Sequence, residues 1–308
     1  MWIRTAAAAS TFLCLSAVLS CRRVPAPDPE PPALFSYWEF AEVDADTIAA
    51  YGELGGRYGW LMVQQPRGFR FTSGKDILGE GVLPAFSFVK LPAGKLPPVR
   101  IPFGINLDFS STKDADLVGL RDLKNLASLS LMSTKVTDEG LKELQGMQNL
   151  TYLNLEGTKV TDRGLKELRE LKELRTLELG RTGVTDVGLQ ELSGLKKLTS
   201  LGLQGAKVTD EGLKRLAGFE TLQSLDLSNT AVSASGLMEL KGLKKLSTLM
   251  LVGVPISDAG VTELQQFKSL AFLYFSGESL TETEEKRLRA ALPKCSVSNM
   301  GLPSKVSK

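Results

Sequence analysis

The sequence contains no histidine at all among its 308 residues. This absence excludes Ser-His-Asp and Cys-His catalysis, and it excludes zinc sites that use histidine ligands. A carboxylate pair could still act as general acid and base. The acidic residues, however, lie mainly in Thr-Asp pairs and charged stretches, where helix capping and solvation explain them. We therefore expect no enzyme activity, no catalytic residues, no bound metal and no cofactor.

Cysteine is also scarce, with three residues in the whole chain. Cys14 and Cys21 lie close to the N-terminus, which leaves Cys295 without a partner for an intramolecular disulfide. A disulfide framework is therefore excluded, and stability must come from the burial of apolar side chains, for which the chain is long enough. We expect Cys295 to be half-buried near the C-terminus and unreactive.

Neither sign of charge is in excess. The 37 basic residues nearly balance the 35 acidic residues, which gives a formal net charge of +2. Lysines such as Lys142, Lys166 and Lys214 stand close to glutamates, a pattern that is typical of a solvated helix face. The charge pattern therefore predicts no nucleic-acid partner.

Long apolar runs are confined to the N-terminus. Residues 1–20 hold one early charge, Arg4, followed by an apolar run, which predicts a signal peptide too short to span a membrane. Residues 21–33 are rich in proline and predict an extended tether. The sequence therefore predicts an exported protein.

The end of this leader, Val18-Leu19-Ser20-Cys21, resembles the bacterial lipobox. The resemblance implies that Cys21 is lipid-modified and holds the protein to a membrane of the bacterial cell envelope without crossing it. Because Arg22 and not Asp follows the cysteine, it also favours the outer membrane. The alternative is an ordinary cleaved signal, which would leave the protein periplasmic or secreted.

The residue that the sequence has in excess is leucine at a fixed spacing. One leucine recurs every 24 residues, at Leu126, Leu150, Leu174, Leu198, Leu222, Leu246 and Leu270. Self-similarity at a fixed period indicates a solenoid, in which each unit is covered by its neighbours.

Each unit reads as a short strand followed by a short helix. Leu129 and Leu131 alternate with polar residues, as in a strand with one buried face. After them comes Val136-Thr137-Asp138, where a hydroxyl or carboxylate can accept hydrogen bonds from the first amides of a helix. Apolar residues then follow at helical spacing. The fold class is therefore α/β.

The pattern LxxLxLxxTxVTDxGLxxL resembles the bacterial leucine-rich repeats of 24 residues. The resemblance covers residues 102–293 and implies about seven full repeats plus a C-terminal cap, with a parallel sheet on the concave side and short helices on the convex side. Where the family often has Asn after the strand, this chain has other residues, which predicts an incomplete side-chain ladder with some groups bonded to water. These residues are Thr134, Thr158, Thr182, Ala206, Thr230 and Val254.

Residues 34–101 precede the repeats and differ from them in composition. They contain Trp38 and Trp60 together with many Phe, Tyr, Gly and Pro residues. A helix is expected within residues 44–56, and strands within residues 57–63, 69–73 and 85–91. The segment is predicted to be an N-terminal cap, or else a small α+β subdomain with its own ligand. Residues 294–308 are expected to form a tail.

The surface best suited to recognition is the concave sheet, because strand residues between the buried leucines must point outward. Towards the C-terminus these outward positions become apolar and aromatic, which solvent exposure disfavours unless a partner covers them. An alternative is that the C-terminal cap folds over them. The predicted partner-binding residues are Tyr152, Glu178, Asp226, Met250, Phe272 and Tyr274.

These observations predict a membrane-tethered module outside the cytoplasm that binds a protein or peptide on its concave face. Two alternatives remain open at this point. One is a structural spacer or scaffold of the envelope without a specific ligand. The other is an enzyme located in residues 34–101.

Overall fold

The structure is a computed structural model that describes residues 43–64, 68–73, 82–276 and 280–300. The chain divides into two units, residues 1–32 and residues 33–308, and the described residues all belong to the second. The predicted signal peptide, the lipidation site Cys21 and its tether, Trp38 and the end of the tail therefore lie outside the described residues.

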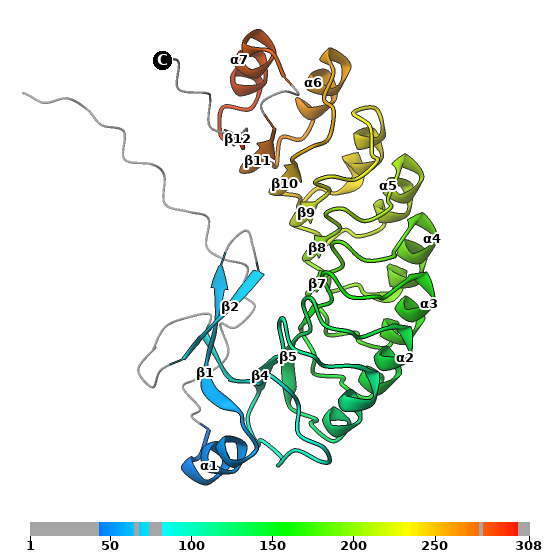
Figure 1. Ribbon diagram of the computed structural model, residues 1–308. Helices are drawn as coiled ribbons and strands as arrows, with labels where there is room; N and C mark the ends of the chain where they lie inside the picture. Colours follow the sequence, from blue (N-terminus) through cyan, green and yellow to red (C-terminus); the bar gives the residue numbers. More distant parts are fainter. Residues whose placement is uncertain (1–42, 65–67, 74–81, 277–279, 301–308) are drawn as a thin grey trace, which may run out of the picture. The chain divides into compact units, whose positions relative to one another are not determined.

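A twelve-stranded sheet runs through the described part of the second unit (Figure 1), with the strand order β12-β11-β10-β9-β8-β7-β6-β5-β4-β3-β1-β2. Neighbouring strands from β3 to β12 are parallel, whereas β1 pairs antiparallel with β2 and β3. The strands are β1 (Arg57–Gln64), β2 (Gly68–Ser73), β3 (Val82–Ser87), β4 (Phe103–Asn106), β5 (Leu126–Ser130), β6 (Tyr152–Asn154), β7 (Thr176–Glu178), β8 (Ser200–Gly202), β9 (Ser224–Asp226), β10 (Thr248–Leu251), β11 (Phe272–Phe275) and β12 (Ser296–Asn299).

Each repeat returns to the sheet through short helices on the opposite side of the core, which Figure 1 shows as the outer side of the curved array. The α-helices are α1 (Ala45–Glu53), α2 (Asp138–Leu141), α3 (Asp162–Leu165), α4 (Asp186–Leu189), α5 (Asp210–Leu216), α6 (Asp258–Leu264) and α7 (Glu282–Ala291). The 3₁₀ helices are η1 (Asp114–Leu120), η2 (Lys142–Leu144), η3 (Lys166–Leu168), η4 (Gln190–Gly194) and η5 (Gly236–Gly242). The predicted α/β solenoid with a parallel sheet is therefore confirmed.

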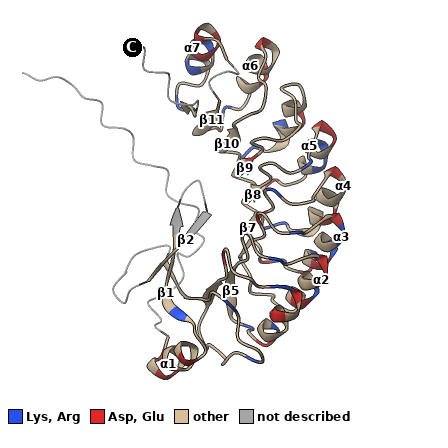
Figure 2. Cartoon of the chain, in the orientation of Figure 1, with Lys and Arg blue, Asp and Glu red and all other residues tan. Residues whose placement is uncertain are grey.

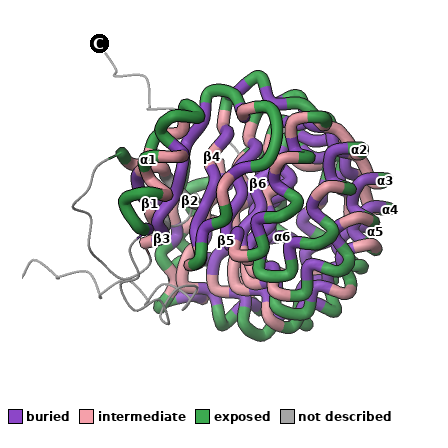
Figure 3. Tube along the Cα trace, turned by 90° about the horizontal axis from the view of Figure 1, so that it is seen from below, coloured by how far each residue is buried: buried purple, intermediate pink, exposed green. Residues whose placement is uncertain are grey.

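The leucines that define the repeat form the core. All seven leucines of the 24-residue series are buried, from Leu126 to Leu270. Figure 3 shows buried stretches recurring along successive coils. Each buried leucine contributes about 1.5–3 kcal/mol, but a single repeat cannot offset the entropy lost in ordering 24 residues. The layers are therefore stable only as a stack.

An aspartate at the start of five successive helices links its own repeat to the next one. In α3, Asp162 accepts a hydrogen bond from the Thr185 amide at 2.8 Å and another from the Thr185 hydroxyl at 2.6 Å. A Cβ at Gly188 would overlap the Asp162 carboxylate, so glycine is required there. We call this arrangement the aspartate clamp, and it recurs at Asp114, Asp138, Asp162, Asp186 and Asp210.

The bend after each strand is held by threonine where the family often has asparagine. The hydroxyl of Thr134 donates to the Leu131 carbonyl at 2.7 Å. Thr158, Thr182 and Thr230 make the same bond within their own repeats. The expected gaps in this ladder therefore fall only where the position is Ala206 or Val254, neither of which has a hydroxyl.

At the position one residue before this threonine, the chain adopts a left-handed backbone conformation in seven successive repeats. From Ser133 onward, residues with side chains alternate with glycines. The side chain of one repeat packs against the glycine of the next repeat. A Cβ atom added at Gly157 would lie 3.0 Å from Ser133 Oγ, and one added at Gly205 would lie 3.3 Å from Arg181 Cγ. The series is Phe109, Ser133, Gly157, Arg181, Gly205, Asn229 and Gly253.

The described part of residues 34–101 continues the array. Strand β3 pairs with β4 of the first repeat, and Tyr51 of α1 stacks on Phe86 with ring centroids 3.9 Å apart. Tyr51 and Phe86 belong to the same core as the repeat leucines. In β1, Leu61 lies over Gly104 on the sheet face that points away from the helices. This segment therefore covers the first leucine layer.

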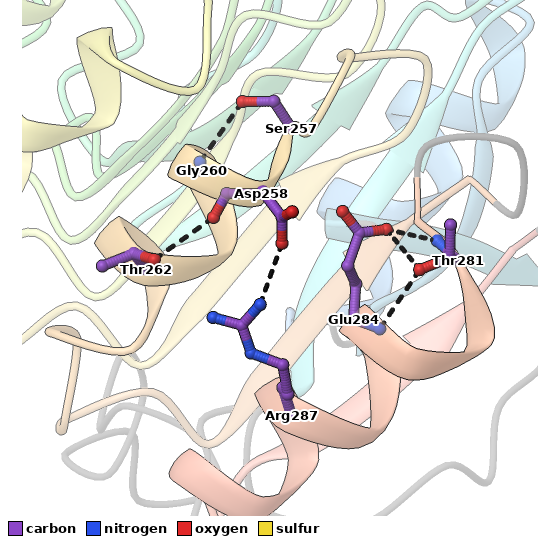
Figure 4. A network of polar contacts seen from close by, with 7 residues as sticks. All are labelled: Ser257, Asp258, Gly260, Thr262, Thr281, Glu284 and Arg287. Carbon is purple, nitrogen blue, oxygen red and sulfur yellow. Dashed lines mark hydrogen bonds and ion pairs between the residues drawn. The ribbon is translucent and has the colours of Figure 1, made fainter.

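The opposite end is covered by α7 and β12. Ala234 stands where a clamp aspartate would be, so the aspartate clamp is missing at this junction. At the following junction, Arg287 of α7 pairs with Asp258 of α6 at 2.9 Å (Figure 4). Helix α7 begins with a capping box, in which Thr281 and Glu284 bond each other's backbone amides.

Candidate functional site

The inner face of the sheet is the face that points away from the helices. Parallel pairing in register places one residue of each strand side by side, as the 24-residue spacing predicts. Figure 2 shows charged residues along the helices and mostly uncharged residues along the strands. The central row of the inner face is Asn106, Ser130, Asn154, Glu178, Gly202, Asp226, Met250 and Tyr274.

Much of this face is more buried than the sequence pattern suggests. Tyr152, which we expected to contact a partner, is only 2% exposed. Asp226 is 9% exposed, and its carboxylate accepts a hydrogen bond from the Ser228 amide two residues later. Strands about 4.8 Å apart bring inner-face side chains close together. Tyr152 therefore exposes almost no surface that a partner could contact. The hydrogen bond from the Ser228 amide holds the Asp226 carboxylate within its own turn.

Carboxylates gather at the middle of the inner face. The Glu178 side chain lies over Gly202, where a Cβ would overlap its carboxylate. Burial, followed by repulsion from Asp226 and Glu156, raises the pKa of Glu178 to about 8. Burial also raises the pKa of Asp226, against the opposing effect of its Ser228 hydrogen bonds. Glu156 is paired with Arg181 at 3.8 Å. A pKa of about 8 favours the protonated form of Glu178 at neutral pH.

The C-terminal part of the inner face carries an aromatic pair. The rings of Phe272 and Tyr274 are stacked, with centroids 6.5 Å apart and planes at 10°. Met250 lies beside Tyr274 in the adjacent strand, and all three side chains are half-buried. The structure thus brings together these three predicted residues, which we call the aromatic cluster. Strand β12 pairs with β11 and so continues the sheet next to this cluster. Helix α7 packs against α6.

Sequence reasoning missed Phe109, the most exposed large apolar residue that the structure describes. It is 76% exposed and has φ = 57°, although left-handed backbone is unfavourable for an aromatic residue. The equivalent position is glycine in three later repeats. The presence of phenylalanine where other repeats have glycine could have drawn attention to Phe109, once that position was known to be left-handed. An exposed side chain on strained backbone suggests a contact role.

Reactive groups are few in the described part of the chain. No group of three or more Cys, Asp and Glu residues there could hold a metal ion. Cys295 is half-buried as expected, and burial raises the pKa of its thiol to about 11. A thiol of that pKa is a weak nucleophile at neutral pH. Within the same residues, no helix is long and apolar enough to cross a membrane.

The repeats match a known family model. The model described as Leucine Rich repeat matches residues 123–144, 146–168, 172–193, 194–217 and 220–241. No curated protein matches the sequence significantly.

Solved structures with significant similarity include two internalins of Listeria monocytogenes. Internalin C2 is 26% identical, with a TM-score of 0.49, and the match covers 67% of this chain and 81% of that one. A second structure, of internalin InlF, is 20% identical, with a TM-score of 0.42 and coverage of 68% of both chains.

Proposed function

The chain is a leucine-rich-repeat protein of the solenoid type, and we propose that it binds a protein or peptide outside the cytoplasm, tethered to the bacterial cell envelope through Cys21. Solenoids of this kind present an extended face that is typical of protein-binding modules. The observation that carries the proposal is the aromatic cluster of Met250, Phe272 and Tyr274, since interface anchors are enriched in such side chains.

The two acidic residues would act differently in this complex. Glu178 is protonated near neutral pH, so it would offer a hydrogen-bond donor and not a negative charge. The Asp226 carboxylate already accepts hydrogen bonds from Ser228, so a polar group of the partner would have to share this carboxylate with Ser228. Tyr152 would join the interface only if its surroundings rearranged on binding.

The test replaces both Phe272 and Tyr274 by Ala and crosslinks the protein in its native envelope. We expect the wild-type chain to yield one defined partner and the double variant to lose it. The matched control is Val187→Ala, which removes an exposed apolar side chain of α4, outside the cluster. Loss of the partner with the control variant alone would contradict the assigned site.

Loss of the partner can be attributed to the binding site only if the double variant still folds stably. Because both rings are half-buried, we expect the double substitution to cost about 1.5–3 kcal/mol in the free energy of unfolding. A much larger loss, measured by thermal unfolding, would mean that the rings act as core residues. Partner loss would then reflect damage to the fold.

A structural spacer is the second candidate, and the aspartate clamps favour it. They join consecutive repeats from Asp114 to Asp210 and would stiffen the array. Recovery of only further copies of this chain in the crosslinking experiment would support the spacer.

The lipid anchor needs its own test. Labelling cells with radioactive palmitate should mark the wild-type protein and leave a Cys21→Ala variant unlabelled. Equal labelling of both proteins, or of neither, would refute the anchor and favour a periplasmic or secreted protein.

A further inference from the structure

A pocket of about 430 Å³ lies beside the segments that lead into β10 and β11. It lies between two successive segments that lead from a helix back to the next strand, residues 241–245 and 265–269. Leu243 and Phe267, both buried, form part of its lining. Three lysines also line it, namely Lys241, Lys244 and Lys268.

The positive charge in this pocket is weakly compensated. Lys241 lies 3.8 Å from Glu263, near the limit for an ion pair, and Lys268 donates to the uncharged carbonyl of Ala291 at 3.2 Å. Within the described ranges, the ammonium group of Lys244 has no ion pair or hydrogen bond, and only its backbone amide donates, to the Gly242 carbonyl. Three ammonium groups around one small cavity repel each other, which an anion would relieve.

A second observation comes from comparing equivalent segments along the array. The tetrapeptide Gly-Leu-Lys-Lys occurs at 194–197 and again at 242–245. At the first copy, Lys197 pairs with Glu173 of the preceding repeat at 2.6 Å. At the second copy, Thr221 replaces that glutamate, so Lys245 has no acid at the equivalent place.

The charge imbalance is therefore local to the C-terminal repeats. Residues 241–245 contain three lysines and no acid, and residues 265–269 contain one lysine and no acid. The equivalent residues 169–173 balance two basic residues against two acidic ones. Glu220 occupies the same place one repeat before Lys244 but forms no ion pair with it.

We propose that this pocket binds a ligand bearing a phosphate group. Lysine binds phosphate as a compact point charge, and the three lysines more than balance the charge of a phosphate ester, which is about −1.5 to −2 near neutral pH. The volume suits a small organic phosphate and exceeds what a bare ion needs. The buried Leu243 and Phe267 would contact the carbon skeleton of the ligand. A soluble phosphate ester and the headgroup of a phospholipid share this chemistry.

The test uses the full chain with Cys21→Ala, so that no acyl chain contributes to membrane binding. One arm titrates glycerol 3-phosphate in a calorimeter. The other arm sediments the protein with vesicles of phosphatidylglycerol in phosphatidylcholine. The pocket variant is Lys244→Gln with Lys268→Gln. The matched control is Lys172→Gln with Lys196→Gln, which removes the same charge at the same repeat positions 72 residues earlier.

We expect saturable binding that the pocket variant weakens about tenfold or more and the control leaves unchanged. Binding of glycerol 3-phosphate would identify a soluble ester as sufficient, and pocket-dependent binding of vesicles alone would identify a lipid headgroup. Absence of binding in both arms, or equal weakening by the two variants, would overturn the proposal.

Discussion

The aspartate clamp makes a testable prediction about how consecutive repeats are held together. Replacing Asp162 by Ala removes both acceptors of Thr185, a residue of the following repeat. The Thr185 amide belongs to the start of α4, where it has no backbone partner within the helix. The substitution leaves the leucine layers intact, so any effect isolates the polar link between two repeats.

The size of the effect follows from the bonds that are lost. Hydrogen bonds to a charged group contribute about 1.5–3 kcal/mol each, and the partial exposure of this pair places it at the lower end. Asp162 also lies in the first turn of α3, where a negative charge adds about 0.3–1 kcal/mol. We expect a total loss of about 2–4 kcal/mol in the free energy of unfolding.

The matched control is Asp258→Ala, at the same position four repeats later. Asp258 also starts a helix, but its side chain pairs with the exposed Arg287 and not with the backbone of the next repeat. An exposed pair of this kind is worth less than about 1 kcal/mol. Denaturant unfolding followed by circular dichroism measures both losses. Equal losses for the two variants would refute the clamp as a stabilising link.

A double-mutant cycle with Gly188 sharpens the test. Gly188→Ala alone should displace the Asp162 carboxylate and cost about as much as removing it. Once Asp162 is Ala, the added methyl group no longer meets the carboxylate. The double variant should therefore lose about 1–2 kcal/mol less than the sum of the single losses.

Further predictions concern ionisation, the bends and the missing clamp. Because the pKa of Glu178 rises from 4.5 unfolded to about 8 folded, the folded state binds more protons between these values, and stability falls as pH rises through this window. We expect a decrease of about 1–3 kcal/mol between pH 5 and pH 8, measured by denaturant unfolding, which Glu178→Gln should largely remove. Gly253→Ala should cost about 1–3 kcal/mol, because its left-handed backbone and the Asn229 side chain both oppose a methyl group. Ala234→Asp should add about 1–2 kcal/mol by supplying the absent clamp to Ser257.

Each of these predictions can fail clearly. An unchanged pH dependence in Glu178→Gln would mean that other groups, such as Asp226, govern the titration. If the Asn229 contact contributes, then Asn229→Gly should recover part of the Gly253→Ala loss, and no recovery would leave backbone strain as the sole cause. A neutral or destabilising Ala234→Asp would show that the junction between the η5 and α6 repeats cannot adopt clamp geometry.

The fold could be predicted from the sequence because its signal is repeated. The 24-residue leucine series determines which face of each strand is buried, and register follows from identical unit lengths. The clamp could not be inferred in the same way. Thr and Asp before a helix indicate capping, and Thr137 does cap α2 through the Glu139 amide. That Asp138 also reaches the next repeat depends on how closely the coils stack.

The candidate site was only partly predictable. The aromatic cluster follows directly from strand periodicity, since Phe272 and Tyr274 are two residues apart and share a face. Burial of Tyr152 does not follow from periodicity, because it depends on the spacing and covering of neighbouring side chains in three dimensions. Phe109 was detectable only once the left-handed position of each repeat was known.

The alternation at the bends also constrains how such an array can change its length. From Ser133 onward, the side chains of Ser133, Arg181 and Asn229 each face a glycine in the following coil, so the pattern at this edge repeats every 48 residues there, whereas Phe109 is followed directly by Ser133. Loss of the single coil that contains Gly157 would bring Arg181 against Ser133. Removal or duplication of two coils together would preserve the alternation, so we expect this array to tolerate insertions and deletions in pairs.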